Sequence, residues 1–266
     1  MTGPITNPYA AQRSGPFLYG LNPLAKLAAP LPAMLLLVFV RDIPTALVFL
    51  AVAYAALIVG ARMTWRLALV LFVAMPAAIA PVAAGLAAWT DPVHVDRSVE
   101  LLTIGSWTLY AGAVEVGLAT GVRLGAIIAL AMVAGVTTNG VDLVRSSVQH
   151  LRVPYRIGYT ALAAFRFVPR FGHELDVIRQ AHRVRGAHAG RGPFAAVSRW
   201  WGYIVPLLAG AIRHAERVAL AMDSRAFGAY PQRTERHTVP LRRRDAVFVA
   251  LFWIATAAIL IIIPRL

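Results

Sequence analysis

The sequence predicts an all-α integral membrane protein of about five transmembrane helices, with about three amphipathic helices inserted before the last span. Three observations predict this class. First, 59% of the 266 residues are hydrophobic and 14% are charged, whereas soluble domains hold about 45–50% apolar and about 25% charged residues. Second, several apolar segments approach the roughly 20 residues that cross a bilayer. Third, residues 139–245 form an arginine-rich amphipathic segment that differs from the rest of the chain.

The net charge of +14 and the absence of cysteine limit the possible functions. A chain without cysteine has no disulfides, no thiolate catalysis and no cysteine-ligated metal site. Residues 139–245 hold 18 arginines against 7 carboxylates, and therefore most of the positive charge. Basic segments of membrane proteins stay in the cytoplasm during insertion and contact anionic lipid. Because these arginines lie beside apolar stripes in helical patterns, we expect no nucleic-acid binding.

The chain begins with a polar segment and continues with four apolar ones. Residues 1–23 are predicted to form a cytoplasmic tail, because the first 20 of them are polar, rich in glycine and proline, and lack the compact apolar core of a signal peptide. Residues 24–138 are predicted to hold four transmembrane helices, at 24–40, 44–60, 67–89 and about 109–136. Pro76 and Pro81 predict kinks in the third helix.

The fourth apolar segment contains two ionisable residues and a glycine pattern. Glu115 and Arg123 are about two helical turns apart, and ionisable groups in lipid indicate function by default. We interpret them as structural, since Glu115 lies near a helix end and Arg123 can pair with a neighbouring helix. The glycines at four-residue and similar spacings predict close packing, either within this chain or against another subunit; they are Gly112, Gly117, Gly121 and Gly125.

The charges of the loops predict the orientation in the membrane. Arg62 and Arg66 follow the second predicted helix, whereas the loop after the third helix is acidic. Since basic loops face the cytoplasm, the amino terminus, residues 61–66 and residues 139–245 are predicted to lie there. The final transmembrane helix is predicted over residues 246–266.

The arginine-rich segment is predicted to form a cytoplasmic domain of amphipathic helices. Its first helix has valines at helical spacing and ends before Pro154. The apolar run that follows has 12 residues, too few to span a bilayer alone, and Pro169 is expected to interrupt the helix. Two more amphipathic helices are predicted, one between Pro169 and Gly186 and one between Pro206 and Gly228.

Two of these helices end alike, with an arginine beside a small residue. Arg185 is followed by Gly186, and Arg225 is followed by Ala226. A cation at the carboxyl end of a helix is favourable by about 0.3–1 kcal/mol, which explains one such arginine without any function. The repetition favours a second role. A small neighbour lets a partner's backbone come close, and a guanidinium binds a carboxylate in bidentate fashion, so these ends are candidate docking sites.

Several stretches, in their order and spacing, are similar to one family of membrane proteins. They are Leu21-Asn22-Pro23-Leu24-Ala25-Lys26-Leu27, Phe165-Arg166-Phe167-Val168-Pro169, Arg179-Gln180-Ala181-His182-Arg183-Val184-Arg185-Gly186, Ala219-Leu220-Ala221-Met222-Asp223-Ser224-Arg225-Ala226-Phe227-Gly228, Arg233-Thr234 and Arg242-Arg243-Arg244-Asp245. Over most of its length the chain resembles the transmembrane T component of energy-coupling factor (ECF) transporters. These EcfT/CbiQ/BioN-like proteins are scaffold subunits of vitamin and metal-ion importers.

The chain departs from the signature of that family, which is Ala-Arg-Gly in two copies. The first copy reads Val184-Arg185-Gly186 and the second reads Ser224-Arg225-Ala226. Both arginines are retained and the small neighbours are retained in part. The valine places a larger side chain beside the first arginine than the alanine of the signature does.

The resemblance implies a non-catalytic subunit of a transport complex in a bacterial or archaeal cytoplasmic membrane. Two ABC ATPase subunits, identical or distinct, would bind ATP and Mg²⁺ and dock on the helices of residues 139–245, the coupling domain. An S component, a small membrane protein, would capture the substrate and change orientation when ATP binds. The residues expected to dock the ATPases are Arg185, Gly186, Arg225 and Ala226, with His182, Arg183 and Asp223 as lesser candidates.

The sequence is less consistent with two other functions. A multi-pass membrane enzyme acting on lipid or prenyl substrates would use the basic segment as a phosphate site, but such enzymes need clustered carboxylates for Mg²⁺, and the sequence has none at a predicted membrane boundary. A permease with its own substrate pathway is disfavoured by the few polar residues in the spans. The seven histidines have no spacing typical of a metal site. The sequence has no phosphate-binding G-x-x-x-x-G-K-[ST] motif, so no ATP hydrolysis by this chain is expected.

Overall fold

A computed structural model describes residues 16–90, 96, 98–104, 107–186, 193–230, 234–235 and 237–263. The predicted tail up to residue 15, the acidic Asp91 and the basic Arg233 lie outside the described residues. The chain divides into two compact units. We call Met1–Asn139 with Pro240–Leu266 the apolar unit, and Gly140–Val239 the basic unit.

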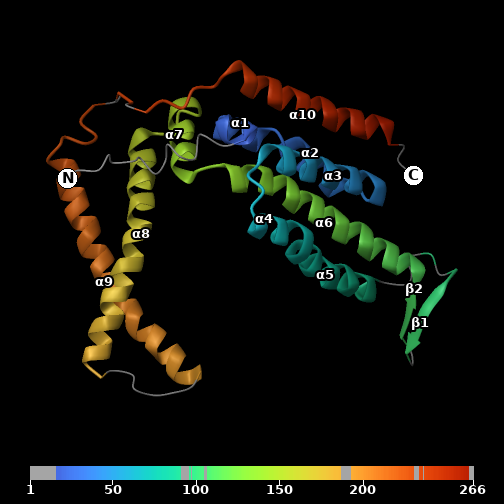
Figure 1. Ribbon diagram of the computed structural model, residues 1–266, viewed down its shortest axis with the longest axis horizontal. Helices are drawn as coiled ribbons and strands as arrows, with labels where there is room; N and C mark the ends of the chain where they lie inside the picture. Colours follow the sequence, from blue (N-terminus) through green and yellow to red (C-terminus); the bar gives the residue numbers. More distant parts are fainter. Residues whose placement is uncertain are drawn as a thin grey trace. The chain divides into compact units, whose positions relative to one another are not determined.

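The apolar unit is built almost wholly of helices (Figure 1). Its elements are the 3₁₀-helix η1 (Phe17–Gly20), α1 (Pro23–Ala28), α2 (Leu31–Phe39), α3 (Ile43–Gly60), α4 (Trp65–Leu69), the π-helical turn η2 (Val70–Ala74), α5 (Met75–Trp89), the strands β1 (Glu100–Ile104) and β2 (Trp107–Tyr110), α6 (Ala111–Thr137) and α10 (Arg243–Ile262). Four stretches of the described residues are long and apolar enough to cross a membrane: α3, the continuous Trp65–Trp89, α6 and α10. The predicted class, an all-α membrane protein, is therefore confirmed.

The segment predicted as the first transmembrane helix has the expected length but is broken in two. α1 and α2 together make an apolar stretch over Pro23–Phe39 that is below the length of the other spans. The break falls at Ala29 and Pro30, and Pro32 lies in the first turn of α2. Since proline has no N–H to donate to the preceding turn, two prolines close together end one helix and begin another.

A two-stranded antiparallel sheet precedes α6 and was not predicted. Strands β1 and β2 pair with Thr103 opposite Thr108 and Ile104 opposite Trp107. Leu109, predicted to begin the fourth transmembrane helix, is instead in β2, and α6 begins at Ala111. β-Branched and aromatic residues favour strands, but the run is too short to have stood out beside long apolar helices.

The kink predicted at Pro76 is a π-helical turn. In this turn each N–H bonds five residues back, as the N–H of Met75 does with the carbonyl of Val70. The same register would pair residue 76 with the carbonyl of Leu71, but proline has no N–H. The hydroxyl of Tyr54 on α3 donates to that carbonyl at 2.7 Å instead. A side chain of a neighbouring helix therefore supplies the hydrogen bond that the proline cannot make.

Helix α6 packs closely against α5 through its glycines. A Cβ atom added at Gly117 would lie 2.5 Å from the carbonyl oxygen of Ala83, and one at Gly121 would lie 2.7 Å from the Cβ of Ala83. The predicted close packing is therefore made within this chain. Arg123 on the same helix donates to the carbonyl of Val40 at 3.3 Å. This carbonyl lies at the carboxyl end of α2, so Arg123 pairs with a neighbouring helix, as expected.

Among its described residues, the basic unit holds three helices, α7 (Gly140–His150), α8 (Tyr155–Val184) and α9 (Pro193–Asp223). The predicted interruption at Pro169 is wrong, because α8 continues through it, and α9 likewise continues through Pro206. A proline inside a helix removes one hydrogen bond and bends the axis. α8 contacts α9 on both sides of Pro169, at Phe167 and at His182.

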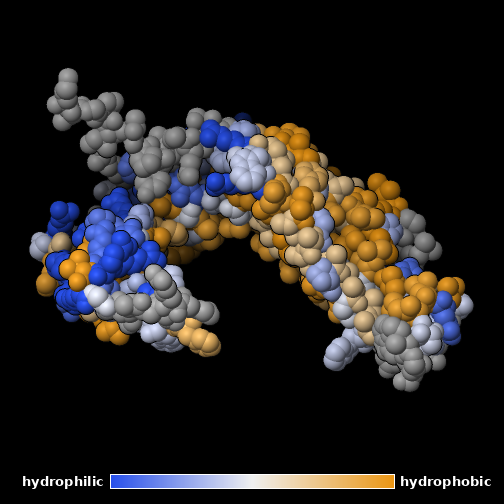
Figure 2. All heavy atoms as spheres, turned by 60° about the horizontal axis from the view of Figure 1, so that its bottom comes forward, coloured by the Kyte–Doolittle hydropathy of each residue, from blue (hydrophilic) through white to orange (hydrophobic). Residues whose placement is uncertain are grey.

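Helices α8 and α9 run in opposite directions and contact each other where they cross (Figure 1). The contacts follow one another in opposite chain order. Phe167 stacks on His214 with ring centroids 4.3 Å apart, and His182 meets Tyr203 edge to face at 5.3 Å. Between them a Cβ atom added at Gly210 would lie 2.9 Å from a carboxylate oxygen of Glu174. Figure 2 shows hydrophilic residues gathered on the visible face of the basic unit and hydrophobic residues on that of the apolar unit.

Candidate functional site

The two predicted arginine ends have the same local backbone geometry. After Arg185, Gly186 adopts the left-handed conformation with φ of +64°, and after Arg225, Ala226 does so with φ of +54°. In each case the left-handed residue donates its N–H to the carbonyl three residues back, Gly186 to Arg183 at 3.2 Å and Ala226 to Asp223 at 2.9 Å. Each arginine is thus the last residue before the chain reverses out of its helix.

The end of α9 completes a Schellman motif. The N–H of Phe227 bonds to the carbonyl of Met222 at 3.0 Å, around the bond from Ala226 to Asp223. These two bonds satisfy carbonyls that a helix end otherwise leaves open. The ring of Phe227 packs at 5.8 Å from that of Tyr155 and 6.2 Å from that of Tyr159. The turn that carries Arg225 is therefore fixed by backbone bonds and by aromatic packing on the start of α8.

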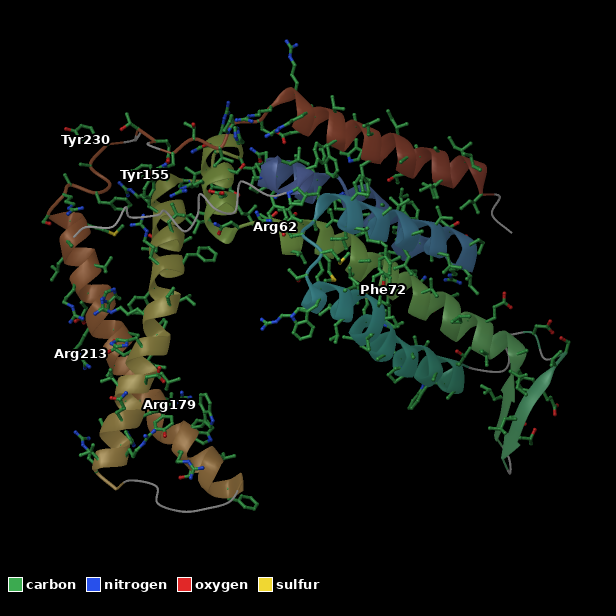
Figure 3. All side chains as sticks on the ribbon, in the orientation of Figure 1. Arg62, Phe72, Tyr155, Arg179, Arg213 and Tyr230 are labelled. Atoms are coloured by element: carbon green, nitrogen blue, oxygen red, sulfur yellow. The ribbon has the colours of Figure 1, made fainter. Side chains whose placement is uncertain are left out.

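Two hydrogen bonds from α8 hold the chain just after this turn. Arg156 donates to the carbonyl of Gly228 at 2.6 Å. The hydroxyl of Tyr155 donates to the carbonyl of Tyr230 at 2.6 Å; Figure 3 labels both tyrosines. Sequence reasoning did not single out Tyr155 or Arg156. One signal was present: a cation in the first turn of a helix opposes the helix dipole, so Arg156 needs another reason to be there.

Most of the predicted docking residues are exposed. Arg183, Arg185 and Gly186 at the end of α8 are exposed, as are Asp223, Arg225 and Ala226 at the end of α9. His182 differs, since it is half-buried and its ring packs on Tyr203. Its position in the contact between α8 and α9 indicates a role in joining the two helices.

The two arginine ends lie at opposite ends of the helix pair. The turn of Arg225 packs on Tyr155, the first residue of α8, whereas Arg185 follows the last residue of that helix. α8 has 30 residues, which at about 1.5 Å per residue makes it about 45 Å long. The structure therefore does not bring Arg185 and Arg225 together into one site but separates them by roughly the length of a helix.

Positive charge surrounds the contact at the middle of the pair. The pKa of His214 is lowered below its ordinary value, chiefly because the ring loses water where it stacks on Phe167. The guanidinium groups of Arg170 and Arg217 lower this pKa further, and Glu174 opposes them. Arg179 lies over the ring of Trp200 at 5.5 Å. Over the described part of the chain, no group of three or more histidines and carboxylates is placed to hold a metal ion.

The comparisons with known proteins agree on one family. The family model described as cobalt transport protein, CbiQ, matches residues 16–236. The energy-coupling factor transporter transmembrane protein EcfT of Thermotoga maritima is 34% identical over 113 residues, which cover 42% of this chain and 40% of that protein. EcfT of Bacillus subtilis is 25% identical over 164 residues, covering 58% of this chain and 62% of that protein.

A third relative carries a different name. A putative ABC transporter ATP-binding protein of Bifidobacterium longum is 34% identical over 98 residues, which cover 36% of this chain and 13% of that protein. The matches to EcfT cover roughly half of those proteins' own lengths, between 40% and 62% in the two cases above. Because the family model spans most of the residues, the chain belongs to the CbiQ family of transport proteins and is a multi-pass membrane protein.

Proposed function

We propose that this protein is the transmembrane scaffold subunit, the T component, of an ATP-driven ECF-type importer. The observation that carries the proposal is the pair of exposed arginine ends, which share one backbone geometry and lie about 45 Å apart along α8. Membership of the CbiQ family and the similarity to EcfT proteins support it. The imported substrate would be a vitamin, a vitamin precursor or a metal ion.

The separation of the two ends favours two partners over one ligand. A small molecule contacts a site of a few ångströms, so it cannot touch Arg185 and Arg225 together. Two copies of one subunit, or two similar subunits, can each receive one end. The relative named as an ATP-binding protein supports ABC ATPases as these partners. ATP and Mg²⁺ would be held by those ATPases, and this chain would be non-catalytic.

Each arginine end suits docking into a groove. An exposed guanidinium binds a carboxylate or main-chain carbonyls through several hydrogen bonds. The left-handed residue next to it turns the backbone away at once, so the arginine stands at the tip of the helix. Gly186 and Ala226 carry little or no side chain, which allows close approach. ATP then does work only if the docked ends make different contacts in the two nucleotide states.

The proposed coupling step depends on the contacts between the two helices. Since α8 and α9 contact each other at Phe167 beside His214 and at His182 beside Tyr203, and the turn after α9 packs on the start of α8, movement of the docked ends would be transmitted through both helices. We propose that this movement reaches the membrane and reorients an S component that holds the substrate. The basic unit would accordingly lie in the cytoplasm of a bacterial or archaeal cell.

Co-purification with tagged ATPase subunits tests the docking sites. The double change Arg185→Ala with Arg225→Ala is expected to lower recovery of the ATPases at least tenfold, while the protein still inserts into the membrane. The matched control is Arg166→Ala with Arg213→Ala, which removes the same charge from exposed positions within the same two helices. Equal recovery of the ATPases with both double variants would contradict docking through the arginine ends.

A further inference from the structure

A short amino-terminal segment contacts both places where the chain passes between its two units. The chain enters the basic unit after Asn139 and returns to the apolar unit at Pro240. Lys26 of α1 donates to the carbonyl of Thr137, the last residue of α6, at 2.7 Å. Four residues earlier, the main-chain N–H of Asn22 donates to Asp245, in the first turn of α10, at 2.8 Å. We call Asn22, Lys26 and Asp245 the clamp.

The clamp is buried and its polar groups are paired. Asn22, Lys26 and Asp245 have exposed fractions of 2%, 2% and 1%. The second oxygen of Asp245 accepts the N–H of Arg242 at 2.6 Å. The side-chain oxygen of Asn22 accepts the N–H of Leu24 at 2.9 Å, and its amide donates to the carbonyl of Pro240 at 3.5 Å. Each of the three side chains therefore bonds to main-chain groups of a helix end or of a crossing.

Stability alone does not account for such a cluster. Burying an ammonium and a carboxylate is costly, and well-packed apolar residues of similar volume are often as stable or more so. Unlike apolar side chains, these polar groups fix geometry, because a hydrogen bond holds a main-chain atom at a fixed distance and angle. Here the atoms held are the end of α6 and the beginning of α10. The clamp thus fixes the two helix ends that lie next to the crossings.

Other contacts in this region provide a comparison. Trp253 donates to the carbonyl of Ala28 at 3.1 Å, which attaches α10 to α1 without touching either crossing. Arg244 donates to the carbonyl of Gly20 at 2.6 Å and reaches neither Thr137 nor Pro240. In the described part of the chain, these bonds join helices of the apolar unit, whereas the clamp also reaches the crossings.

We infer that the clamp limits movement between the two units, so that displacement of the basic unit is passed to α6 and α10 as whole helices. Without it, two short linkers would absorb part of the displacement. Asn22, Lys26 and Asp245 would be positioning residues for the coupling step. The consequence for transport rests on the proposed function, but the limit on movement does not.

Spin-label distance measurements test the limit on movement directly. The chain has no native cysteine, so single cysteines at the exposed Val59 of the apolar unit and Gln180 of the basic unit give one defined pair. In nanodiscs, Lys26→Met and Asp245→Asn are each expected to broaden the distance distribution at least twofold. Trp253→Phe is the matched control and should leave the width unchanged. Equal widths in all four proteins would overturn the inference.

A milder substitution keeps the test possible if the other two variants misfold. Asn22→Ser retains an oxygen for the N–H of Leu24 but shortens the side chain and removes the amide that reaches Pro240. It is expected to broaden the distribution less than Lys26→Met does. If Lys26→Met and Asp245→Asn do not yield monodisperse protein, the width for Asn22→Ser against Trp253→Phe decides the matter, and equal widths reject the clamp.

Transport by the reconstituted complex tests the consequence. The clamp variants are expected to keep the ATPase subunits bound but to import at least tenfold less substrate per ATP hydrolysed than the wild type and Trp253→Phe. Broad distance distributions with unchanged import per ATP would reject the role of the clamp in coupling. If the wild type itself shows no ATP-dependent import, the proposed function fails, and the distance measurement still decides whether the clamp limits movement.

Discussion

Ala226 occupies a backbone conformation that usually belongs to glycine. Its φ of +54° places it in the left-handed region, and Gly186 holds the equivalent position at the other arginine end with φ of +64°. A residue with a Cβ atom pays roughly 1–2 kcal/mol there. The departure from Ala-Arg-Gly noted in the sequence thus leaves the backbone geometry of the second end unchanged but makes it less stable.

This strain predicts opposite effects for two exchanges. Ala226→Gly is expected to stabilise the protein by about 1 kcal/mol, and Gly186→Ala to destabilise it by about the same amount. The free energy of unfolding, measured for both variants in the same detergent, checks the prediction. Each variant serves as the control for the other, and effects of the same sign would show that the left-handed conformation is not what limits stability.

His214 predicts a dependence of stability on pH. Its pKa is lowered in the folded protein, so the unfolded chain takes up the proton more readily. The free energy of unfolding is therefore not reduced by His214 above the ordinary histidine pKa of about 6.5. As the pH falls below that value, protonation of His214 in the unfolded chain progressively lowers the free energy of unfolding. Thermal unfolding between pH 7.5 and pH 5 should show this decline. His214→Phe, which retains a ring to stack on Phe167, is expected to flatten it.

A second histidine on α8 provides the control for that measurement. His173 is exposed, and His173→Phe should leave the decline in stability as it is in the wild type. A decline of equal size in wild type and His214→Phe would show that other groups cause it.

At the scale of elements, the π-helical turn depends on a residue of another helix. Tyr54→Phe removes the hydroxyl that pairs with the carbonyl of Leu71 and is expected to destabilise the protein by about 1–3 kcal/mol, the cost of an unpaired buried acceptor. In a Pro76→Ala background, residue 76 regains an N–H that can serve the same carbonyl. There the cost of Tyr54→Phe should be smaller.

A double-mutant cycle over these two positions measures the effect. The free energies of unfolding of the wild type, both single variants and the double variant give the coupling between Tyr54 and Pro76. If the changes in free energy of unfolding for Tyr54→Phe and Pro76→Ala simply add, the hydroxyl of Tyr54 does not replace the hydrogen bond that Pro76 cannot donate. Pro169 also lies inside a continuous helix, α8, and α8 contacts α9 on either side of it.

At the scale of the whole molecule, the distance between the arginine ends predicts different effects of substitutions on ATPase binding and on transport. Sites about 45 Å apart share no contacts, so the losses in ATPase binding free energy for Arg185→Ala and Arg225→Ala should add in the double variant. ATP-driven import is expected to behave differently. Each single variant should lose most of it, since both ends must be held for the helix pair to be moved.

Titration of the ATPases and import assays on the two single variants, the double variant and Arg213→Ala check this prediction. Arg213→Ala removes an exposed charge from the middle of α9 and should leave both readouts unchanged. Import at half the wild-type rate in each single variant would show that the two ends act independently.

The sequence predicted the features that depend on local pattern. Hydropathy and charge identified the membrane class, and the helical pattern with its small neighbours marked Arg185 and Arg225, whose docking role stays a prediction. What it missed depends on contacts distant in the chain. α8 continues through Pro169 beside contacts with α9, the hydroxyl of Tyr54 donates to the carbonyl of Leu71, and Lys26 donates to the carbonyl of Thr137 across 111 positions. A single sequence does not show such pairs.

The antiparallel contacts between α8 and α9 also bear on timing. Ring contacts join the two helices at Phe167 beside His214 and at His182 beside Tyr203, and Phe227 after α9 packs on Tyr155 at the start of α8. If these contacts make the pair move as one rigid body, a displacement at one arginine end also displaces the other. Two ATPase subunits docked at the two ends would therefore have to change conformation at the same time, and an ATPase that is arrested on one side would also stop movement on the other.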